Sequence, residues 1–162
     1  MENFESVKAR VVAIAKEKEA CSSEAKRAEN STTIEDLLRV VKDNFLWSCR
    51  NGILSPEMVD AFGIETLNQN QLYINQNASE GFLFASGSAT VHASGSATVE
   101  AYGSATVRAF DSATVRASGS AYINSYSSID HKISENAICL YYYDNRIVIA
   151  EGVKTIEKKT HS

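Results

Sequence analysis

An eight-residue repeat fills the second half of the chain and constrains the fold more than any other feature. Starting at Ala85, five successive octads read ASGSATVH, ASGSATVE, AYGSATVR, AFDSATVR and ASGSAYIN. They then diverge through SYSSIDHK, ISENAICL and YYYDNRIV. A unit of eight residues cannot bury an apolar face alone, so its copies must stack on one another. The repeat therefore predicts a solenoid.

Within each octad, apolar and polar residues alternate in the manner of a β-strand. Small apolar residues occupy the first, fifth and seventh positions, while Ser, Thr, aromatic and charged residues occupy the even positions. Gly-Ser or Asp-Ser at positions three and four predicts a corner, which leaves about five residues of strand between corners. The pattern thus predicts short strands around a thin interior of Ala and Val.

The number of octads in one coil can be inferred from side-chain size. Ala and Val are too small to fill the wide interior of a triangular coil of three octads at native packing density. Two octads per coil also sort the variable residues into outward columns. The aromatic column contains Ser94, Phe110, Tyr126 and Tyr142. The charged column contains Glu100, Arg116 and Lys132, with opposite charges adjacent. We expect two octads per coil, and three is the alternative.

Before residue 68 the apolar residues recur at helical spacing instead. Thr32 precedes Glu35 at the distance of a capping box, and Ser55-Pro56 is typical of a helix start. We expect four helices, two of them short, with a core around Trp47. The predicted class is α+β, with a helical capping domain over 1–67, an octad-repeat β-solenoid (β-helix) over 68–156 and a frayed tail over 157–162.

Composition limits the classes of function. With 44% hydrophobic and 22% charged residues, the chain is not of the disordered type, and no apolar run approaches a membrane span. Cys21, Cys49 and Cys139 have the spacing of neither a disulfide framework nor a zinc site. The net charge of −4 argues against direct nucleic-acid binding. We expect a cytoplasmic protein with no metal or cofactor.

In the pattern of residue types within each repeat, the octads from Ala85 to Asn124 resemble the AGYGSTxT-type repeats of bacterial ice-nucleation proteins. That resemblance implies sixteen-residue coils stacked as a β-solenoid. A helical segment, then octads, then the sequence INSY over Ile123 to Tyr126 also resembles uncharacterised helical-plus-octad-repeat proteins of gut-type bacteria and their mobile elements. This second resemblance covers nearly the whole chain and implies no assigned activity and no functional residue.

Neither catalysis nor ice binding is favoured by the residues. The three histidines are scattered and no nucleophile elbow is present, so we expect no enzyme. His131 occupies an inward position seven: it is either a hydrogen-bonded core histidine or marks a register slip near Ile129 or a solvent-reached end, and we favour the latter pair. With two octads per coil each face stacks only two of the repeat threonines, which disfavours an ice-binding protein.

Grouped aromatic residues are the remaining functional signal. Tyr and Phe at outward positions, followed by three consecutive tyrosines, are typical of interfaces rather than of solvent-exposed strands. Packing within the chain is the alternative. The predicted partner-binding residues are Tyr102, Phe110, Tyr126, Tyr141, Tyr142 and Tyr143.

The last hydrophobic stretch, with Asp144-Asn145 as a turn, predicts either a capping hairpin or an open edge that joins two chains tail to tail. The predicted function is a non-catalytic protein-interaction or self-assembly module, whose partner is another protein or a second copy in a homo-oligomer, as a dimer through this edge. The alternative, which follows from the mobile-element resemblance, is an anti-CRISPR-like inhibitor that sterically blocks a bacterial defence or nucleic-acid-processing complex.

Overall fold

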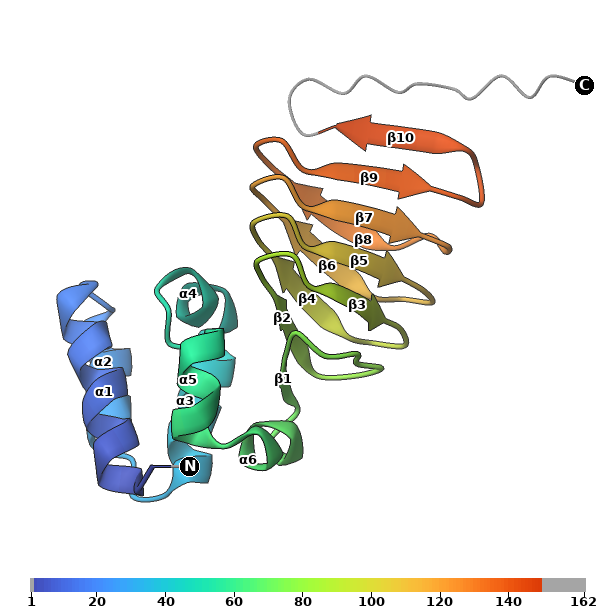
Figure 1. Cartoon of the computed structure of the whole chain (residues 1–162). Helices are drawn as coiled ribbons and strands as arrows, with labels where there is room; N and C mark the ends of the chain where they lie inside the picture. The colour runs from blue at the N-terminus through green and yellow to red at the C-terminus, as the bar shows by residue number, and fades with distance from the viewer. Residues whose placement is uncertain (1, 150–162) are drawn as a thin grey trace, which may run out of the picture. The chain divides into compact units, whose positions relative to one another are not determined.

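The computed structural model describes residues 2–149, and the chain divides after Ile74 into two compact units. The first unit is helical and ends in a short strand, while the second is a β-solenoid (Figure 1). The α+β class and the order predicted from the sequence, helices and then stacked octads, are confirmed. No helix within residues 2–149 has the length and apolar character that a membrane crossing requires.

The first unit contains more helices than the sequence predicted. Its elements are α1 (Phe4–Glu17), α2 (Ser22–Glu29), α3 (Ile34–Asp43), α4 (Phe45–Arg50), α5 (Pro56–Phe62), α6 (Ile64–Gln69) and β1 (Leu72–Ile74). The apolar stripe from Ile34 to Cys49 predicts one helix, but the helix breaks at Asn44, whose side-chain amide donates to the carbonyl of Val40 over 2.9 Å and so ends α3. The polar residues from Thr66 to Gln71 predict a connector, but α6 extends through this segment as far as Gln69.

The helix starts show where the capping residues act. The N-cap of α3 is Thr33, whose hydroxyl accepts from the backbone N–H of Asp36 over 3.1 Å. The predicted Thr32–Glu35 pair is therefore one residue too early. Ser55 occupies the N-cap position of α5 and Pro56 follows it, as predicted, although the Ser55 side chain makes no capping hydrogen bond. The unit's largest fully buried side chains include Leu37, Leu38 and Phe62, whereas Trp47 is only half-buried and lies at the edge of the core, not at its centre.

The second unit is a flattened coil of two sheets that makes about four turns. Its strands are β2 (Phe82–Ala85), β3 (Thr90–Ala93), β4 (Thr98–Ala101), β5 (Thr106–Ala109), β6 (Thr114–Ala117), β7 (Tyr122–Ser125), β8 (Asp130–Ile133), β9 (Ile138–Tyr141) and β10 (Arg146–Ile149). Strands β2, β4, β6 and β8 form a parallel ladder that we call sheet A. Strands β3, β5, β7, β9 and β10 form sheet B.

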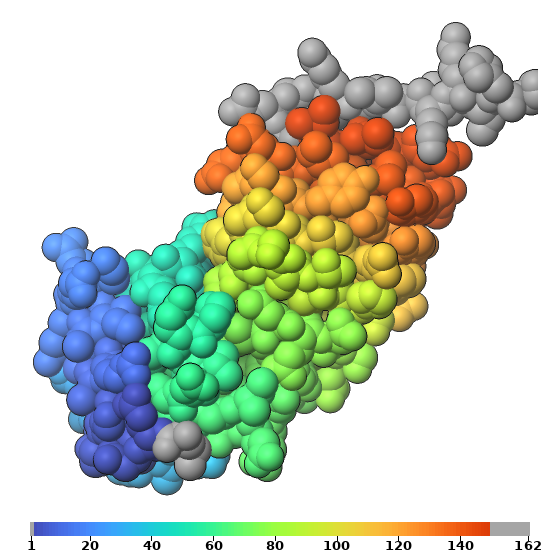
Figure 2. All heavy atoms as spheres, viewed as in Figure 1, coloured from blue at the N-terminus to red at the C-terminus, as the bar shows by residue number. Residues whose placement is uncertain are grey.

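The register confirms two octads per coil. Val91 pairs with Val107 and Val107 with Ile123, so each residue meets the residue sixteen positions later in the chain. From Val91 to Ala137 the valines and alanines of the octads face inward and are almost completely buried, as the alternation predicted, while Ala89 in the first octad is half-buried. In Figure 2 the coils pack directly on one another in chain order, from yellow-green to orange. The small side chains therefore let the two sheets close on a thin core.

Glycine is favoured at corners such as Gly119, where successive corners touch. Gly119 has a φ of +69°, and a Cβ there would lie 3.0 Å from the carbonyl oxygen of Gly103 in the preceding coil. Asp111 and Glu135 also adopt left-handed backbone, with φ values of 55° and 57°. Their carboxylates accept from the backbone N–H of the glycine one coil earlier, over 3.1 Å at Gly95 and 2.7 Å at Gly119. These hydrogen bonds tie the coils together at the corners.

The last coil corrects one sequence prediction and supports another. Strand β8 stays in register with β6, with Val115 opposite His131, so the expected slip near Ile129 is wrong. Strand β10 turns back at Asp144-Asn145 and pairs antiparallel with β9, which is the hairpin alternative. Residues 150–162 lie outside the described part of the chain, so the solenoid end predicted at 156 and the tail predicted over 157–162 are not addressed.

Candidate interaction surface

The outer side of sheet B changes from polar to apolar along the solenoid. On β3 and β5 it carries threonines together with the exposed His92 and Arg108. On β7 and β9 the corresponding pairs are Tyr122 opposite Ile138 and Asn124 opposite Leu140, so the buried amide of Asn124 is the one polar side chain among them. Directly opposite residues of paired strands project to the same side, so Ile147 of β10 extends the surface beyond Leu140. We call this surface the apolar face: Phe110, Tyr122, Tyr126, Ile138, Leu140, Tyr142, Ile147 and Ile149.

A ladder of three stacked rings forms one side of the apolar face. The ring centroids of Phe110 and Tyr126 lie 4.7 Å apart with 6° between the planes, and those of Tyr126 and Tyr142 lie 4.9 Å apart with 3°. This is the aromatic column that the sixteen-residue step predicted. Tyr126 and Tyr142 are 41% and 48% exposed. Since neighbouring rings cover each other's faces, the ladder presents ring edges and hydroxyl groups outward.

The other predicted aromatic residues do not join the ladder. Tyr102 follows β4 of sheet A, is half-buried and lies against Phe84, with 5.8 Å between ring centroids. Tyr141 is only 1% exposed, so its expected place on the surface is wrong. It occupies position one of its octad, which faces inward in every coil, and the register alone would have shown this. Tyr143 is exposed and touches the edge of the Tyr141 ring, with 5.6 Å between centroids.

Sheet A presents a different outer side. Glu100 is buried and pairs with Arg116 over 3.8 Å, so the predicted adjacency of opposite charges is confirmed. Asp130 and Lys132 on β8 are both exposed. The outer side of sheet A therefore ends in charges where the outer side of sheet B ends in apolar and aromatic residues.

A cluster of titratable groups fills the interior of the last coil. The Tyr141 hydroxyl is hydrogen-bonded to Nδ1 of His131, and the rings meet edge to face with 5.3 Å between centroids. The Arg146 guanidinium lies over the Tyr141 ring, 4.5 Å from its centroid. Burial, and to a lesser degree Arg146, lowers the pKa of His131, while burial raises the pKa of Tyr141 and that of Cys139 to about 11. The three groups are therefore uncharged at neutral pH.

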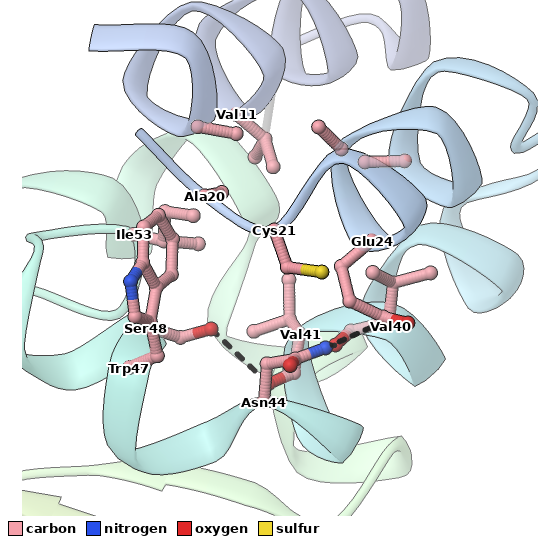
Figure 3. A pocket seen from close by; sticks show the side chains of 13 residues that line it. Val11, Ala20, Cys21, Glu24, Val40, Val41, Asn44, Trp47, Ser48 and Ile53 are labelled. Atoms are coloured by element: carbon pink, nitrogen blue, oxygen red, sulfur yellow. Dashed lines mark hydrogen bonds between the residues drawn. The ribbon is translucent and has the colours of Figure 1, made fainter. Parts of the chain in front are cut away.

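The helical unit contains a pocket that no sequence pattern predicts. It has a volume of about 120 Å³ and is lined mainly by apolar side chains such as Val11, Ala15 and Ile53 (Figure 3). Its amide and hydroxyl groups bond to neighbours: Asn44 donates to the Glu24 carboxylate over 2.8 Å, and Ser48 to a backbone carbonyl. These residues come from α1, α2, α3, α4 and the segment after α4, and no motif in the sequence connects them.

Cys21 lies at the rim of this pocket as the N-cap of α2 and is exposed, whereas Cys49 and Cys139 are buried. Its sulfur is 3.2 Å from the hydroxyl of Ser23, and hydrogen bonding by Ser23 lowers the pKa of the thiol. Within residues 2–149 no group of three or more His, Cys, Asp or Glu side chains has the arrangement of a metal site.

Comparison with known proteins assigns the chain to no family, because no family model, no curated protein and no solved structure matches it. Function is therefore inferred from the geometry of the molecule alone.

Proposed function

We propose that the chain is a non-catalytic interaction module that binds a protein partner, or a second copy of itself, through the apolar face of sheet B. The observation that carries the proposal is the aromatic ladder, in which Tyr126 and Tyr142 stay largely exposed beside aliphatic side chains of three neighbouring strands. Contiguous apolar surfaces of this kind mark interaction sites in soluble proteins, and tyrosine is prominent among the residues that dominate binding energy.

The geometry of the ladder favours a protein over a nucleic acid or a sugar. Bases bind by stacking on free ring faces, but the face of Tyr126 is covered on both sides by its neighbours. The apolar face contains no Lys or Arg, since the Arg146 side chain turns inward over Tyr141, and the cation beside it is Arg108 on β5, the strand that precedes Phe110. A phosphate backbone would therefore find a counter-charge only at the polar border of this surface, where Arg108 lies. Ring edges, hydroxyls and aliphatic side chains instead suit the mixed surface of another protein.

Self-association has a specific route at the end of sheet B. In the part of the chain that the structure describes, the far edge of β10 pairs with no other strand, and its outward residues Ile147 and Ile149 are uncharged. Strand β8, which ends sheet A, instead exposes Asp130 and Lys132, and charges of this kind discourage strand addition. A second copy would therefore add at β10 rather than at β8, in the tail-to-tail sense expected from the sequence.

A double substitution in the ladder tests the proposed function. The variant with Phe110→Ser and Tyr126→Ser loses two rings of the apolar face and no interior side chain, so the β-rich circular dichroism is expected to persist. Association, measured by sedimentation for self-assembly and by affinity capture for a partner, is expected to weaken about tenfold or more. Tyr102→Ser is the matched control, because Tyr102 follows a strand of sheet A.

Equal association of the double variant and the control would contradict the proposal, and so would a native protein that is monomeric and retains no partner. A captured component of a defence or nucleic-acid-processing complex that the double variant fails to retain would identify the inhibitor alternative, since steric blockade would use the same face.

A further inference from the structure

The interior of the last coil differs chemically from that of the coils before it. Position seven of the octads in sheet A is Val99 and then Val115, both completely buried, but in the next coil it is His131. Position one in sheet B is Ala109, then Ser125, and then Tyr141. Aliphatic packing between the two sheets is thus replaced at the end of the solenoid by a polar contact between two side chains.

This contact bridges the two sheets and lies directly behind the apolar face. His131 belongs to β8 in sheet A and Tyr141 to β9 in sheet B, so their hydrogen bond joins the last strands of both sheets. Side chains alternate along β9, so Leu140 and Tyr142, which flank Tyr141 in the chain, project to the opposite side. Whatever loosens the contact between His131 and Tyr141 therefore acts on the strand that carries part of the apolar face.

Burial and the charge of Arg146 oppose a positive charge on the His131 ring, whereas the backbone carbonyl of Ile129 and the carboxylate of Asp130 favour it. Cys139 and Tyr141 face it from β9, and both are uncharged at neutral pH. Arg146 faces it from β10 and lowers the pKa of His131, in addition to the larger effect of burial. Asp130, its neighbour on β8, acts weakly in the opposite direction, and Val115 of β6 brings no charge. Asp144 pairs with Arg146 over 3.5 Å.

We propose that the His131–Tyr141 pair is a pH-sensitive lock that holds the last coil closed and so regulates the apolar face. In the neutral ring, Nδ1 and the Tyr141 hydroxyl share one hydrogen bond. Protonation turns Nδ1 into a donor, so the Tyr141 hydroxyl must reverse its role in this bond, and it places a cation in the half-buried interior near Arg146. The last coil then opens, and the part of the apolar face on β9 and β10 is lost. This regulation rests on the proposed function of that face.

The direction of the pH dependence follows from the lowered pKa of His131 in the folded coil. An opened coil returns the ring to its ordinary pKa of about 6.5, so between that value and the folded pKa the open form binds more protons. The contribution of the lock to stability is complete above about pH 6.5 and is lost as the pH falls through 6.5 toward the folded pKa.

Hydrogen exchange tests the lock without requiring a partner. Amide protection in β8, β9 and β10 is compared between about pH 7.5 and about pH 5.5, after correction for the intrinsic pH dependence of exchange, with β4 and β5 as the internal reference. Protection of the last three strands is expected to fall about threefold or more at the lower pH, while that of the reference strands stays constant. An unchanged protection ratio would overturn the proposal.

Two variants assign the effect to the ring. His131→Asn keeps an acceptor near the place of Nδ1 but does not titrate, so the ratio is expected to become independent of pH. His92→Asn removes an exposed histidine of β3 and is expected to behave like the native chain. A His131→Asn variant that retains the full pH dependence would overturn the lock. Hydrogen exchange tests the pH-sensitive lock even if no partner binds. Loss of association in the ladder variant tests the proposed function of the apolar face even if exchange does not change with pH.

Discussion

At the scale of single residues, the corners of the solenoid decide how closely the coils can stack. Gly87 and Gly119 have nearly the same left-handed backbone, with φ values of +62° and +69°, but different surroundings. A Cβ at Gly119 would lie 3.0 Å from the Gly103 carbonyl oxygen, whereas one at Gly87 would meet nothing within 4 Å. At both positions the left-handed backbone would strain any L-residue with a side chain. At Gly119, but not at Gly87, the added side chain would also overlap the preceding corner.

These two glycines give a matched pair of substitutions. Gly87→Ala is expected to lower the free energy of unfolding by about 1 kcal/mol through backbone strain. Gly119→Ala is expected to lower it by about 2 kcal/mol or more, because the overlap with the preceding corner adds to the strain. Chemical denaturation followed by circular dichroism measures both. Equal losses in the two variants would mean that the corners can move apart without cost.

The exposed thiol should react differently from the buried ones. Cys21 is exposed and its pKa is lowered by Ser23, while burial raises the pKa of Cys139 to about 11. Since the thiolate is the nucleophile, iodoacetamide is expected to alkylate Cys21 first, and Ser23→Ala is expected to slow that reaction. Peptide mass spectrometry of partly modified protein measures the rates, and faster labelling of Cys139 would contradict the expectation.

At the scale of elements, helix starts can be tested one residue at a time. Thr33 accepts a backbone N–H bond at the start of α3, whereas the hydroxyl of Thr32 bonds only to the side chain of Asp36. Thr33→Ala is therefore expected to cost about 1 kcal/mol of unfolding free energy, and Thr32→Ala clearly less. Thermal unfolding compares the stability of the two variants. A larger loss in Thr32→Ala than in Thr33→Ala would show that Thr32 is the capping residue, as the sequence pattern predicted.

The elements that the sequence predicted correctly are those whose pattern repeats. Each octad carries the same alternation, so strands such as β5 and β6 and their sixteen-residue register followed from side-chain size and column sorting. The break at Asn44 did not, because it depends on a side chain that bonds to the backbone of its own helix, while the apolar stripe continues across it. The pocket beside Cys21 was missed because residues from several helices meet there only after folding.

At the scale of the whole molecule, the two sheets are not interchangeable although their octads are nearly identical. In sheet A the eighth position of the octad is Phe84 and then Glu100, both buried, and in sheet B it is His92 and then Arg108, both exposed. The aromatic ladder belongs to sheet B alone. A deletion of sixteen residues therefore keeps each later octad on its own sheet, whereas a deletion of eight residues moves every later octad to the other sheet.

Two internal deletions, one of sixteen and one of eight residues, test this difference between the sheets. Removing 86–101 joins Ala85 to Tyr102, and removing 86–93 joins Ala85 to Ser94, so both junctions reproduce the Ala101–Tyr102 or Ala93–Ser94 junction of the native chain. The sixteen-residue deletion removes one coil and keeps the ladder on its own sheet, so cooperative unfolding and association are expected to persist with modestly lower stability.

The eight-residue deletion keeps more of the chain but is expected to be the more damaging of the two. It places Arg108 beside Phe84, where the native chain buries Glu100, and burial of an unmatched cation is costly. Thermal unfolding and sedimentation of the two deletions measure the difference. Equal stability would mean that an octad fits equally well in either sheet. The assignment of the apolar face to one sheet would then lose its structural basis.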